Sequence, residues 1–414
     1  MRESGMTLEQ RIFSEERAAR IVSAMQAQID VGNFCGIEWR LARDHKVLHS
    51  GKVGLRDTDS GVPVPDGALY RVYSMTKPVI SALLMMLWEE GRFRLYDPLS
   101  RFLPAFADRQ VLIREADGSE RLEPARRPIN IADLLTHTSG LSYDFLYDCP
   151  VAERYAEAVI IGDGESTLEM LVARIAEFPL AKHPGSTYHY SVSVDVAAHL
   201  AQVIADKPLG ELLRERLFEP LGMADTAFHV PEGKRDRVMG MYGTPFLHTP
   251  VPPAEMPPQQ LTPLPVDDSH PFDKPGIYER GGHGLFSTTE DYGRFADMLV
   301  AGKTTDGRPL LAGPTLDLFT ANRLTDKHLP FVINGLPTPG YGFGLGVRVR
   351  MDVGRTYTPG RVGEFGWAGA ATTNFWVDPE ENITGVFMTQ YQGPSGTVEP
   401  VTDEFRTLAY STLV

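Results

Sequence analysis

Apolar residues recur every three or four positions along two early segments of the chain. The first segment spans residues 8–30, and the second begins after Ser74. Such spacing places the apolar side chains on one face of a helix. It predicts an amphipathic helix over residues 8–30 and a buried helix that ends near Gly91. Between them, residues 36–42 and 46–51 flank a polar turn and predict two strands.

The middle of the chain has a different pattern, in which helical spacing is interrupted by loops. Residues 111–122 contain an Asp-Gly turn between short apolar runs, which predicts a hairpin. Asn130 is a suitable N-cap for a short helix that follows it. Three longer segments also carry helical spacing: residues 166–178, 192–205 and 208–217. A proline-rich stretch near 245–275 is incompatible with a helix or an inner strand, and we expect it to be a long loop folded over the body of the protein.

Alternating and helical patterns return near the end of the chain. Helices are predicted over residues 287–302 and about 399–408. Strand-like alternation marks three further segments: residues 343–349, 372–377 and 383–388.

The order of these elements predicts an α/β protein of the α+β kind. Residues 1–95 and 280–414 would together form one antiparallel sheet flanked by helices. Residues 96–279 would form a mostly helical domain that contains the proline-rich loop. Ser74 would then lie near the junction of the two domains, where clefts usually form.

The composition restricts the partners of the protein. The 414 residues carry 40 basic and 54 acidic side chains, which gives a net charge of −14. This excess of acid argues against nucleic acid as a partner, because phosphate binding needs a basic surface. Two cysteines, Cys35 and Cys149, are too few for a disulfide framework, so we expect a reducing compartment, although one bond between them stays open. Neither an apolar leader nor a membrane span is evident, so we expect a soluble, cytoplasmic protein without a membrane partner.

A serine and a lysine with the spacing of a catalytic pair open the second helix. Ser74-Met75-Thr76-Lys77 is the only Ser-x-x-Lys in the chain. A serine hydroxyl needs a base to act as a nucleophile. Because residues three apart share one face of a helix, Lys77 can supply an amine to Ser74. Free backbone N–H groups at the start of a helix also favour the negative charge that develops during acyl transfer.

Two further segments supply candidates for the rest of an acyl-transfer site. Tyr190 is a candidate proton carrier, because a phenol near an ammonium loses its proton more easily. The small residues of 366–371 precede a predicted strand and would let the backbone approach a ligand closely. There the Ala370 N–H would pair with the Ser74 N–H to form an oxyanion hole. The plain alternatives are a core aromatic for Tyr190 and an ordinary start of a strand for residues 366–371.

Four segments occur in a characteristic order: Tyr73–Pro78, Leu134–Leu141, Pro184–Ser191 and Gly281–Thr288. This order resembles that of the serine β-lactamase-like hydrolases, a family that includes class C β-lactamases, D-alanyl-D-alanine peptidases, family VIII carboxylesterases and related acyltransferases. The resemblance spans roughly residues 20–410 and implies a β-lactamase/transpeptidase-like fold. It implies that Ser74 is the nucleophile, that Lys77 is its helper and that Tyr190 belongs to a Tyr-x-Asn-like motif. It also implies that His137 belongs to a structural loop.

Two departures from the family pattern concern the substrate. Trp367-Ala368-Gly369 stands where the family has Lys-Thr-Gly, so the lysine that would pair with the carboxylate of a penicillin or peptide is absent. Tyr190-Ser191-Val192 lacks the asparagine that would contact a substrate amide. Both changes favour a neutral or apolar ester, and family VIII carboxylesterases look closest because some of them carry Trp-x-Gly at this place. Trp367 and Gly369 would therefore bind substrate, and Tyr143, just after the structural loop, could also reach the cleft.

The function predicted from these residues is that of a serine carboxylesterase. It would hydrolyse short-chain or small neutral esters, its small-molecule partners, through an acyl-enzyme on Ser74. A β-lactamase, a D-amino peptidase or an acyltransferase of the same family remains an alternative, as does a binding protein without activity. Because the chain contains no His-Glu-x-x-His and no paired-cysteine motif, we expect no metal and no other cofactor.

Overall fold

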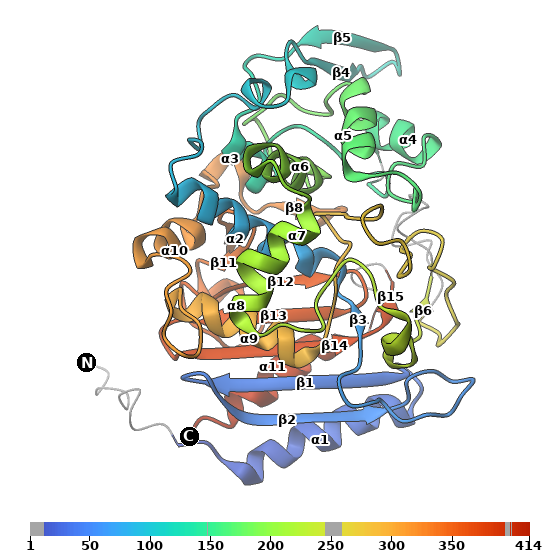
Figure 1. Cartoon of the computed structure of the whole chain (residues 1–414), viewed down its shortest axis with the longest axis vertical. Coiled ribbons are helices and arrows are strands. Elements are labelled where there is room, and N and C mark those ends of the chain that lie inside the picture. The colour runs from blue at the N-terminus through green and yellow to red at the C-terminus, as the bar shows by residue number, and fades with distance from the viewer. Residues whose placement is uncertain (1–11, 147, 245–258, 394–397, 399) are drawn as a thin grey trace.

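The computed structural model describes residues 12–146, 148–244, 259–393, 398 and 400–414. Its centre is a seven-stranded antiparallel sheet with the strand order β10-β11-β12-β13-β14-β1-β2 (Figure 1). The bounds of these strands are β1 Gly36–Arg43, β2 Lys46–Gly54, β10 Tyr341–Phe343, β11 Arg348–Arg350, β12 Phe365–Gly369, β13 Thr373–Asp378 and β14 Ile383–Thr389. Strands from the two ends of the chain lie side by side, so the predicted antiparallel sheet and the α/β fold class are confirmed.

Helices cover both faces of this sheet. On one face, α1 (Glu15–Asp30) and α11 (Val401–Ser411) pack against each other and against β2 and β14, respectively. Their apolar residues form one buried cluster with Trp39 and Phe387 of the sheet. On the other face, α9 (Thr289–Ala301) packs against β1, β13 and β14. The amphipathic pattern of the first predicted helix is thus the pattern of a helix that covers a sheet.

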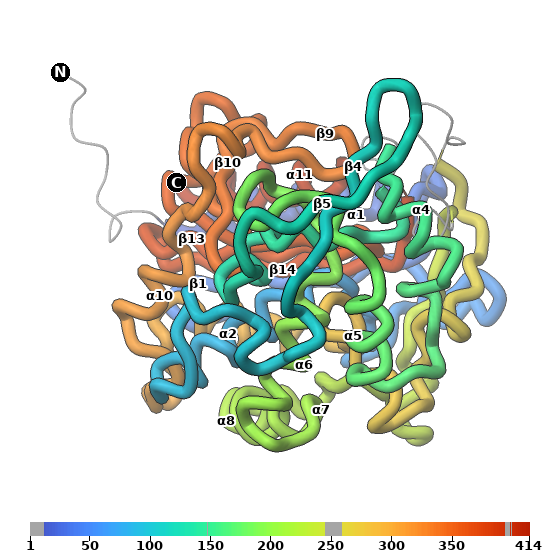
Figure 2. The backbone as a smooth tube through the Cα atoms, turned by 90° about the horizontal axis from the view of Figure 1, so that it is seen from above, coloured from blue at the N-terminus to red at the C-terminus, as the bar shows by residue number. Residues whose placement is uncertain are grey.

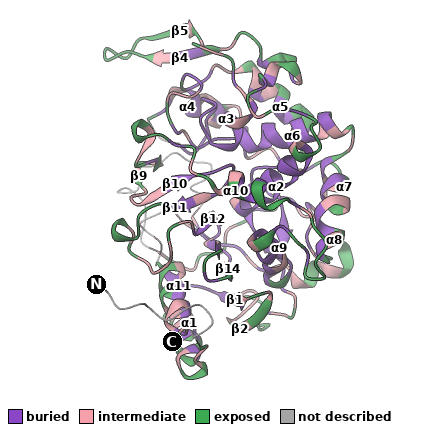
Figure 3. Ribbon diagram, turned by 90° about the vertical axis from the view of Figure 1, so that its left-hand side faces the viewer, coloured by how far each residue is buried: buried purple, intermediate pink, exposed green. Residues whose placement is uncertain are grey.

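The helix α2 (Thr76–Glu89) runs through the interior of the molecule. Its residues from Thr76 to Leu87 are all buried. It contacts α6 (Ser193–Ala205), and the single turn Tyr73–Met75 that precedes it contacts β12 and β13. Figure 3 shows buried residues along both helices. A helix that is apolar around its circumference belongs in the interior, so the predicted buried helix after Ser74 is confirmed.

A layer of short helices that includes α3 to α6 lies on the far side of α2 from the sheet, and α7 and α8 lead from this layer back to α9 (Figure 1). Besides α6, the bounds of these helices are α3 Ile131–Leu135, α4 Pro150–Glu157, α5 Leu168–Glu177, α7 Leu209–Leu213 and α8 Glu219–Leu221. One turn of π-helix, Arg214–Phe218, joins α7 to α8. The predicted hairpin is present as β4 (Gln110–Arg114) and β5 (Glu120–Pro124), and it projects from the body of the molecule (Figure 2). The division of the chain into two domains remains a prediction.

Short elements tie the loops to this frame. Three pairs of short strands are β3 Tyr70–Arg71 with β7 Phe286–Ser287, β6 Tyr242–Gly243 with β15 Tyr391–Gln392, and β8 Val332–Ile333 with β9 Leu336–Pro337. The remaining helical segments are α10 Gly313–Thr320 and the 3₁₀ turns Leu99–Arg101, Pro104–Phe106, Glu232–Arg237, Asp326–His328 and Val353–Arg355. The β3–β7 pair places the Gly281–Thr288 segment beside the turn that holds Ser74.

Residues 343–349 do not form the single strand that their alternation predicts. Strand β10 ends at Phe343, β11 begins at Arg348, and a turn separates them. Gly346 in this turn has a φ of 94° and lies against Ser81 of α2, where any side chain would overlap the serine. Packing against a distant helix therefore sets the turn, and a local pattern cannot reveal such packing.

Three other sequence-based expectations can be compared with the structure. Residues 245–258 of the proline-rich stretch lie outside the described residues, and residues 259–276 form neither helix nor regular strand, as expected of a loop. Cys35 and Cys149 are both buried and free, which excludes a bond between them. In the described part of the chain, no helix is both long and apolar enough to cross a membrane.

Candidate active site

A cleft of about 320 Å³ opens beside the turn that holds Ser74. Its walls come from this turn, from the helical layer, from the loop around residues 269–283 and from strands β11 and β12. Six residues that were expected in the site line it: Ser74, Tyr143, Tyr190, Trp367, Gly369 and Ala370. Residues from distant parts of the sequence therefore meet in one cleft, as the motifs predict.

Ser74 lies on a single helical turn that continues into α2, so Lys77 follows it on the same side. The Lys77 Nζ is 3.0 Å from Ser74 Oγ and 2.8 Å from the carbonyl oxygen of Gly282. The lysine is buried, with 1% of its surface exposed. Tyr73, just before the serine, has a φ of 43°, a conformation that costs free energy for a residue with a side chain. The backbone is therefore strained at the residue that precedes Ser74.

The Tyr190 hydroxyl donates a hydrogen bond to Ser74 Oγ over 2.8 Å. Its ring centre lies 4.7 Å from Lys77 Nζ, and the ring of Tyr143 lies 5.1 Å from the same nitrogen. Two aromatic faces of this kind attract an ammonium group. Ser74 Oγ therefore has an amine and a phenol within hydrogen-bond distance.

A buried carboxylate, which the sequence reasoning missed, fixes the loop that holds Lys77. Asp195 on α6 accepts a hydrogen bond from the Gly282 N–H over 2.8 Å at its Oδ1. Burial raises the pKa of Asp195, while the Gly282 N–H and the positive charges of Lys77 and Arg280 act in the opposite direction. A side chain at Gly282 would overlap Asp195 Oδ2 and crowd the Tyr143 hydroxyl, so only glycine fits this position without a shift. The available signal was a lone acidic residue inside the apolar helical pattern of 192–205.

The end of strand β12 forms the opposite wall of the cleft. Residues 366–371 were expected to lead into a strand, but Phe365–Gly369 is itself a strand, and Ala370 follows it. Trp367 is buried, and its ring centre lies 5.8 Å from that of Tyr190. A side chain at Gly369 would overlap the Val72 carbonyl, so the missing side chain lets β12 approach the turn that holds Ser74. Ala370 and Ser74 therefore border the same cleft, as an oxyanion hole requires.

The family model for beta-lactamases matches residues 20–404 of the chain. The chain belongs to the beta-lactamase family. Protein Rv1367c of Mycobacterium tuberculosis (strain H37Rv) is 35% identical over 370 residues, and the match covers 87% of each chain. Esterase EstB of Burkholderia gladioli is 29% identical over 407 residues, and the match covers 95% of each chain. The solved structure of EstCE1, a hydrolase with promiscuous acyltransferase activity, has a TM-score of 0.78 at 25% identity and covers 95% of this chain and 99% of its own.

These comparisons confirm the family and the fold that the four motifs imply. In this member of the beta-lactamase family, the loop after α3 packs beneath Tyr190. His137 in that loop is fully buried, and its ring centre lies 4.6 Å from that of Tyr190. Burial holds the pKa of His137 well below its usual range, so the ring is neutral, and its Nδ1 accepts a hydrogen bond from the Ser191 N–H over 3.3 Å. A neutral ring that binds backbone fits the expected structural role of His137.

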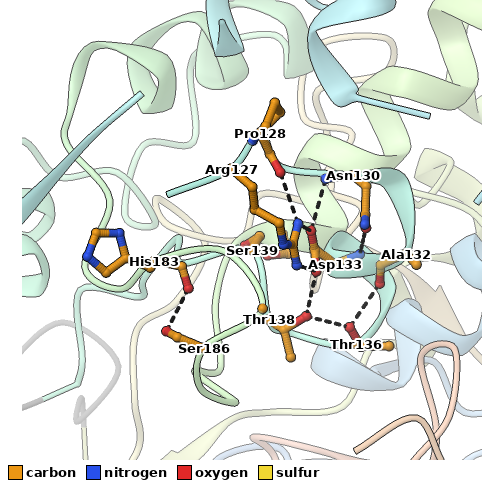
Figure 4. Close-up of polar contacts among 12 residues, drawn as sticks. Arg127, Pro128, Asn130, Ala132, Asp133, Thr136, Thr138, Ser139, His183 and Ser186 are labelled. Atoms are coloured by element: carbon orange, nitrogen blue, oxygen red, sulfur yellow. Dashed lines mark hydrogen bonds and ion pairs between the residues drawn. The ribbon is translucent and has the colours of Figure 1, made fainter. Parts of the chain in front are cut away.

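A polar cluster around Asp133 anchors this family loop from the outside (Figure 4). Asp133 completes the N-terminal cap of α3 with Asn130 and forms a two-point ion pair with Arg127. Its Oδ1 also accepts a hydrogen bond from the Thr138 hydroxyl over 2.9 Å. Because Thr138 follows His137 directly, the cluster fixes the position of the histidine and, through it, the packing under Tyr190.

Proposed function

We propose that this member of the beta-lactamase family is a serine carboxylesterase that acts on small esters that are neutral around the reacting carbonyl. The observation that carries the proposal is the position of Ser74 Oγ, which lies 3.0 Å from Lys77 Nζ and 2.8 Å from the Tyr190 hydroxyl. A serine with two proton-carrying groups at these distances is equipped as an activated nucleophile.

The chemistry would proceed in two halves. Ser74 Oγ attacks the ester carbonyl carbon, and its proton passes to the pair formed by Lys77 and Tyr190. The N–H groups of Ser74 and Ala370 stabilise the oxyanion of the tetrahedral intermediate. When the C–O bond breaks, the same pair returns the proton to the departing alkoxide, which leaves as the alcohol. Water then attacks the acyl-enzyme and gives up a proton to the pair. The pair returns this proton to Ser74 Oγ as the acyl C–O bond breaks, which releases the acid and free Ser74.

The cleft supports an ester in preference to a β-lactam or a peptide. Trp367 stands where the family's lysine would bind a carboxylate next to the reacting bond. Its ring joins Tyr143, Phe145 and Ile161 in a lining dominated by apolar side chains. Such a wall gains free energy from burying apolar substrate surface and offers no cation to a penicillin carboxylate at this place. The esterase named among the relatives, EstB, supports the same substrate class.

Active-site labelling with a fluorophosphonate tests the nucleophile. We expect the unmodified chain to be labelled on Ser74 and to release p-nitrophenol from p-nitrophenyl butyrate in a burst followed by steady turnover. Ser74→Ala should lose the label and the burst. Ser23→Ala, which changes an exposed serine on α1, serves as the matched control. Full activity in Ser74→Ala would refute the proposal.

A second candidate activity is acyl transfer to an alcohol, which the description of EstCE1 brings into consideration. An apolar cleft would favour an alcohol over water as the group that attacks the acyl-enzyme. Adding a short alcohol such as butanol to the ester assay would then yield a butyl ester in place of part of the free acid. If free acid alone is formed at all butanol concentrations, hydrolysis is the only reaction.

A further inference from the structure

The cleft contains one charged residue that the proposed reaction does not use. Among the residues described as lining it, Arg348 is the only lysine, arginine, aspartate or glutamate. The chain as a whole carries a net charge of −14. A cation in an otherwise uncharged lining, within an acidic protein, points to a negatively charged part of the ligand.

Arg348 is held in place without being neutralised. It opens strand β11, pairs with Gly366 of β12, and its guanidinium lies 4.3 Å from the ring centre of Tyr341. Within the described part of the chain, its guanidinium has no ion-pair partner. Arg350, two residues further along the same strand, is by contrast fully buried and paired with Glu364. A structural role therefore accounts for Arg350 and leaves the charge of Arg348 available.

A second pocket continues the cleft past Arg348. It has a volume of about 210 Å³ and shares Pro337, Thr338 and Arg348 with the first. Its other lining is mainly polar and includes Asn374, several threonines and the exposed Asp403. Arg406 also lines it, but this side chain is paired with Glu364. The combined groove thus runs from an apolar part at Ser74 to a polar part, with Arg348 at the boundary.

We propose that Arg348 binds a carboxylate on the substrate, so that the preferred esters are those with an acidic group remote from the reacting carbonyl. This inference rests on the proposed esterase function. Gly366, which pairs with Arg348, is three residues from Gly369 along β12, which corresponds to about 10 Å at roughly 3.3 Å per residue. A carboxylate bound by Arg348 would therefore lie away from the scissile bond, toward the polar part of the groove. A penicillin carries its carboxylate close to the reacting ring, where Trp367 offers no charge, so this subsite does not restore a β-lactam site.

Binding to the Ser74→Ala variant tests the subsite without turnover. The probes are monomethyl octanedioate, with its carboxylate on the acyl side, and 7-acetoxyheptanoate, with its carboxylate on the alcohol side. Each is compared by calorimetry with its methyl-capped neutral form. We expect at least one acidic ester to bind ten or more times more tightly than its capped form, with an affinity that falls as NaCl is raised. Equal affinities for both pairs, or no dependence on salt, would overturn the proposal.

Variants of Arg348 assign the effect to this side chain. In the Ser74→Ala background, Arg348→Met should abolish the preference for the acidic ester and change the affinity for the neutral ester by no more than about twofold. Arg348→Lys should keep part of the preference. Arg355→Met removes an exposed arginine outside both pockets and serves as the matched control. A preference that persists in Arg348→Met would refute the subsite. Arg348-dependent binding together with a lack of ester turnover by the unmodified chain would refute the esterase function alone.

Discussion

Lys77 and Asp195 are joined through a single residue, Gly282. The lysine donates to the Gly282 carbonyl over 2.8 Å, and the aspartate accepts from the N–H of the same glycine over 2.8 Å. Lys77, beside Ser74, is thus positioned through Gly282 by a carboxyl group on α6. Asp195 is therefore a positioning residue, and its replacement tests how far catalysis depends on the position of Lys77.

Replacing Asp195 should affect kcat according to whether an acceptor remains. Asp195→Asn keeps an oxygen that can accept from Gly282, so we expect kcat to fall by less than about tenfold. Asp195→Ala leaves a buried N–H unpaired, which should cost about 1–3 kcal/mol of unfolding free energy and lower kcat much further. Measurement of kcat, KM and urea unfolding for both variants checks this. Equal losses in kcat for the two variants would contradict a positioning role.

Gly282→Ala should disturb the same connection from the backbone side. The added methyl group would overlap Asp195 Oδ2 and crowd the Tyr143 hydroxyl. We expect a loss of about 1–3 kcal/mol in unfolding free energy and a lower kcat, because the carbonyl that holds Lys77 must shift. Gly233→Ala is the control, since its new methyl group would meet no atom within 4 Å. Unchanged activity in Gly282→Ala would show that Lys77 does not depend on this carbonyl.

Tyr190→Phe should lower kcat by about 10²- to 10⁴-fold, the usual range for the loss of a proton carrier. The ring and its packing remain, so the melting temperature should change little. Tyr188→Phe is a matched control, because the buried Tyr188 hydroxyl has no hydrogen-bond partner among the described residues. Steady-state kinetics on p-nitrophenyl butyrate distinguish the two. If both variants retain full activity, Tyr190 carries no proton.

Nitrocefin should be turned over much more slowly than p-nitrophenyl butyrate by the unmodified chain. Trp367 provides an apolar face where a β-lactam needs a cation for its carboxylate, and one such charge-assisted contact contributes about 1.5–3 kcal/mol. The comparison of kcat/KM for the two substrates is the measurement. A higher value for nitrocefin would favour a β-lactamase over an esterase.

Asp144 should make stability depend on pH. Burial raises its pKa to about 7, while backbone N–H groups oppose part of the rise. The unfolded chain loses this proton near pH 4, but the folded chain loses it near pH 7, so stability should fall as pH rises from about 4 to about 7. Asp144→Asn cannot ionise, and its stability relative to the unmodified chain should therefore rise over the same interval. Urea unfolding at pH 4, 5.5 and 8 checks the sign, and a constant difference would contradict it.

The parts of the fold and site that the sequence predicted were those with a local signature. The apolar pattern after Ser74 predicted α2, and helical spacing alone brought Lys77 to the serine. The ordered motifs predicted that Tyr190 lies in the site, because family resemblance supplies long-range information that local spacing lacks.

The residues that were missed depend on contacts between distant segments. Gly282 is 205 positions from Lys77, and no local pattern connects the two. The position of Arg348 at the start of β11 follows from the turn at Gly346. This turn splits the predicted strand because it packs against α2. The single acidic residue Asp195 in an apolar helical pattern was a visible signal, but its partner Gly282 was not.

The pairing of β1 with β14 has a consequence for how the protein acquires its activity. Ile37 is in register with Thr389, so this ladder closes a loop of some 350 residues. Pairings of such long range form slowly, since the entropy of closing the loop is lost before the contacts form. During synthesis β1 can pair with β2, but its other edge stays unpaired until β14 has been made, and unpaired edges attract other chains. The sheet that contains β12, the wall opposite Ser74, is therefore completed late. The open edge of β1 stays exposed to aggregation until the last strands have been made.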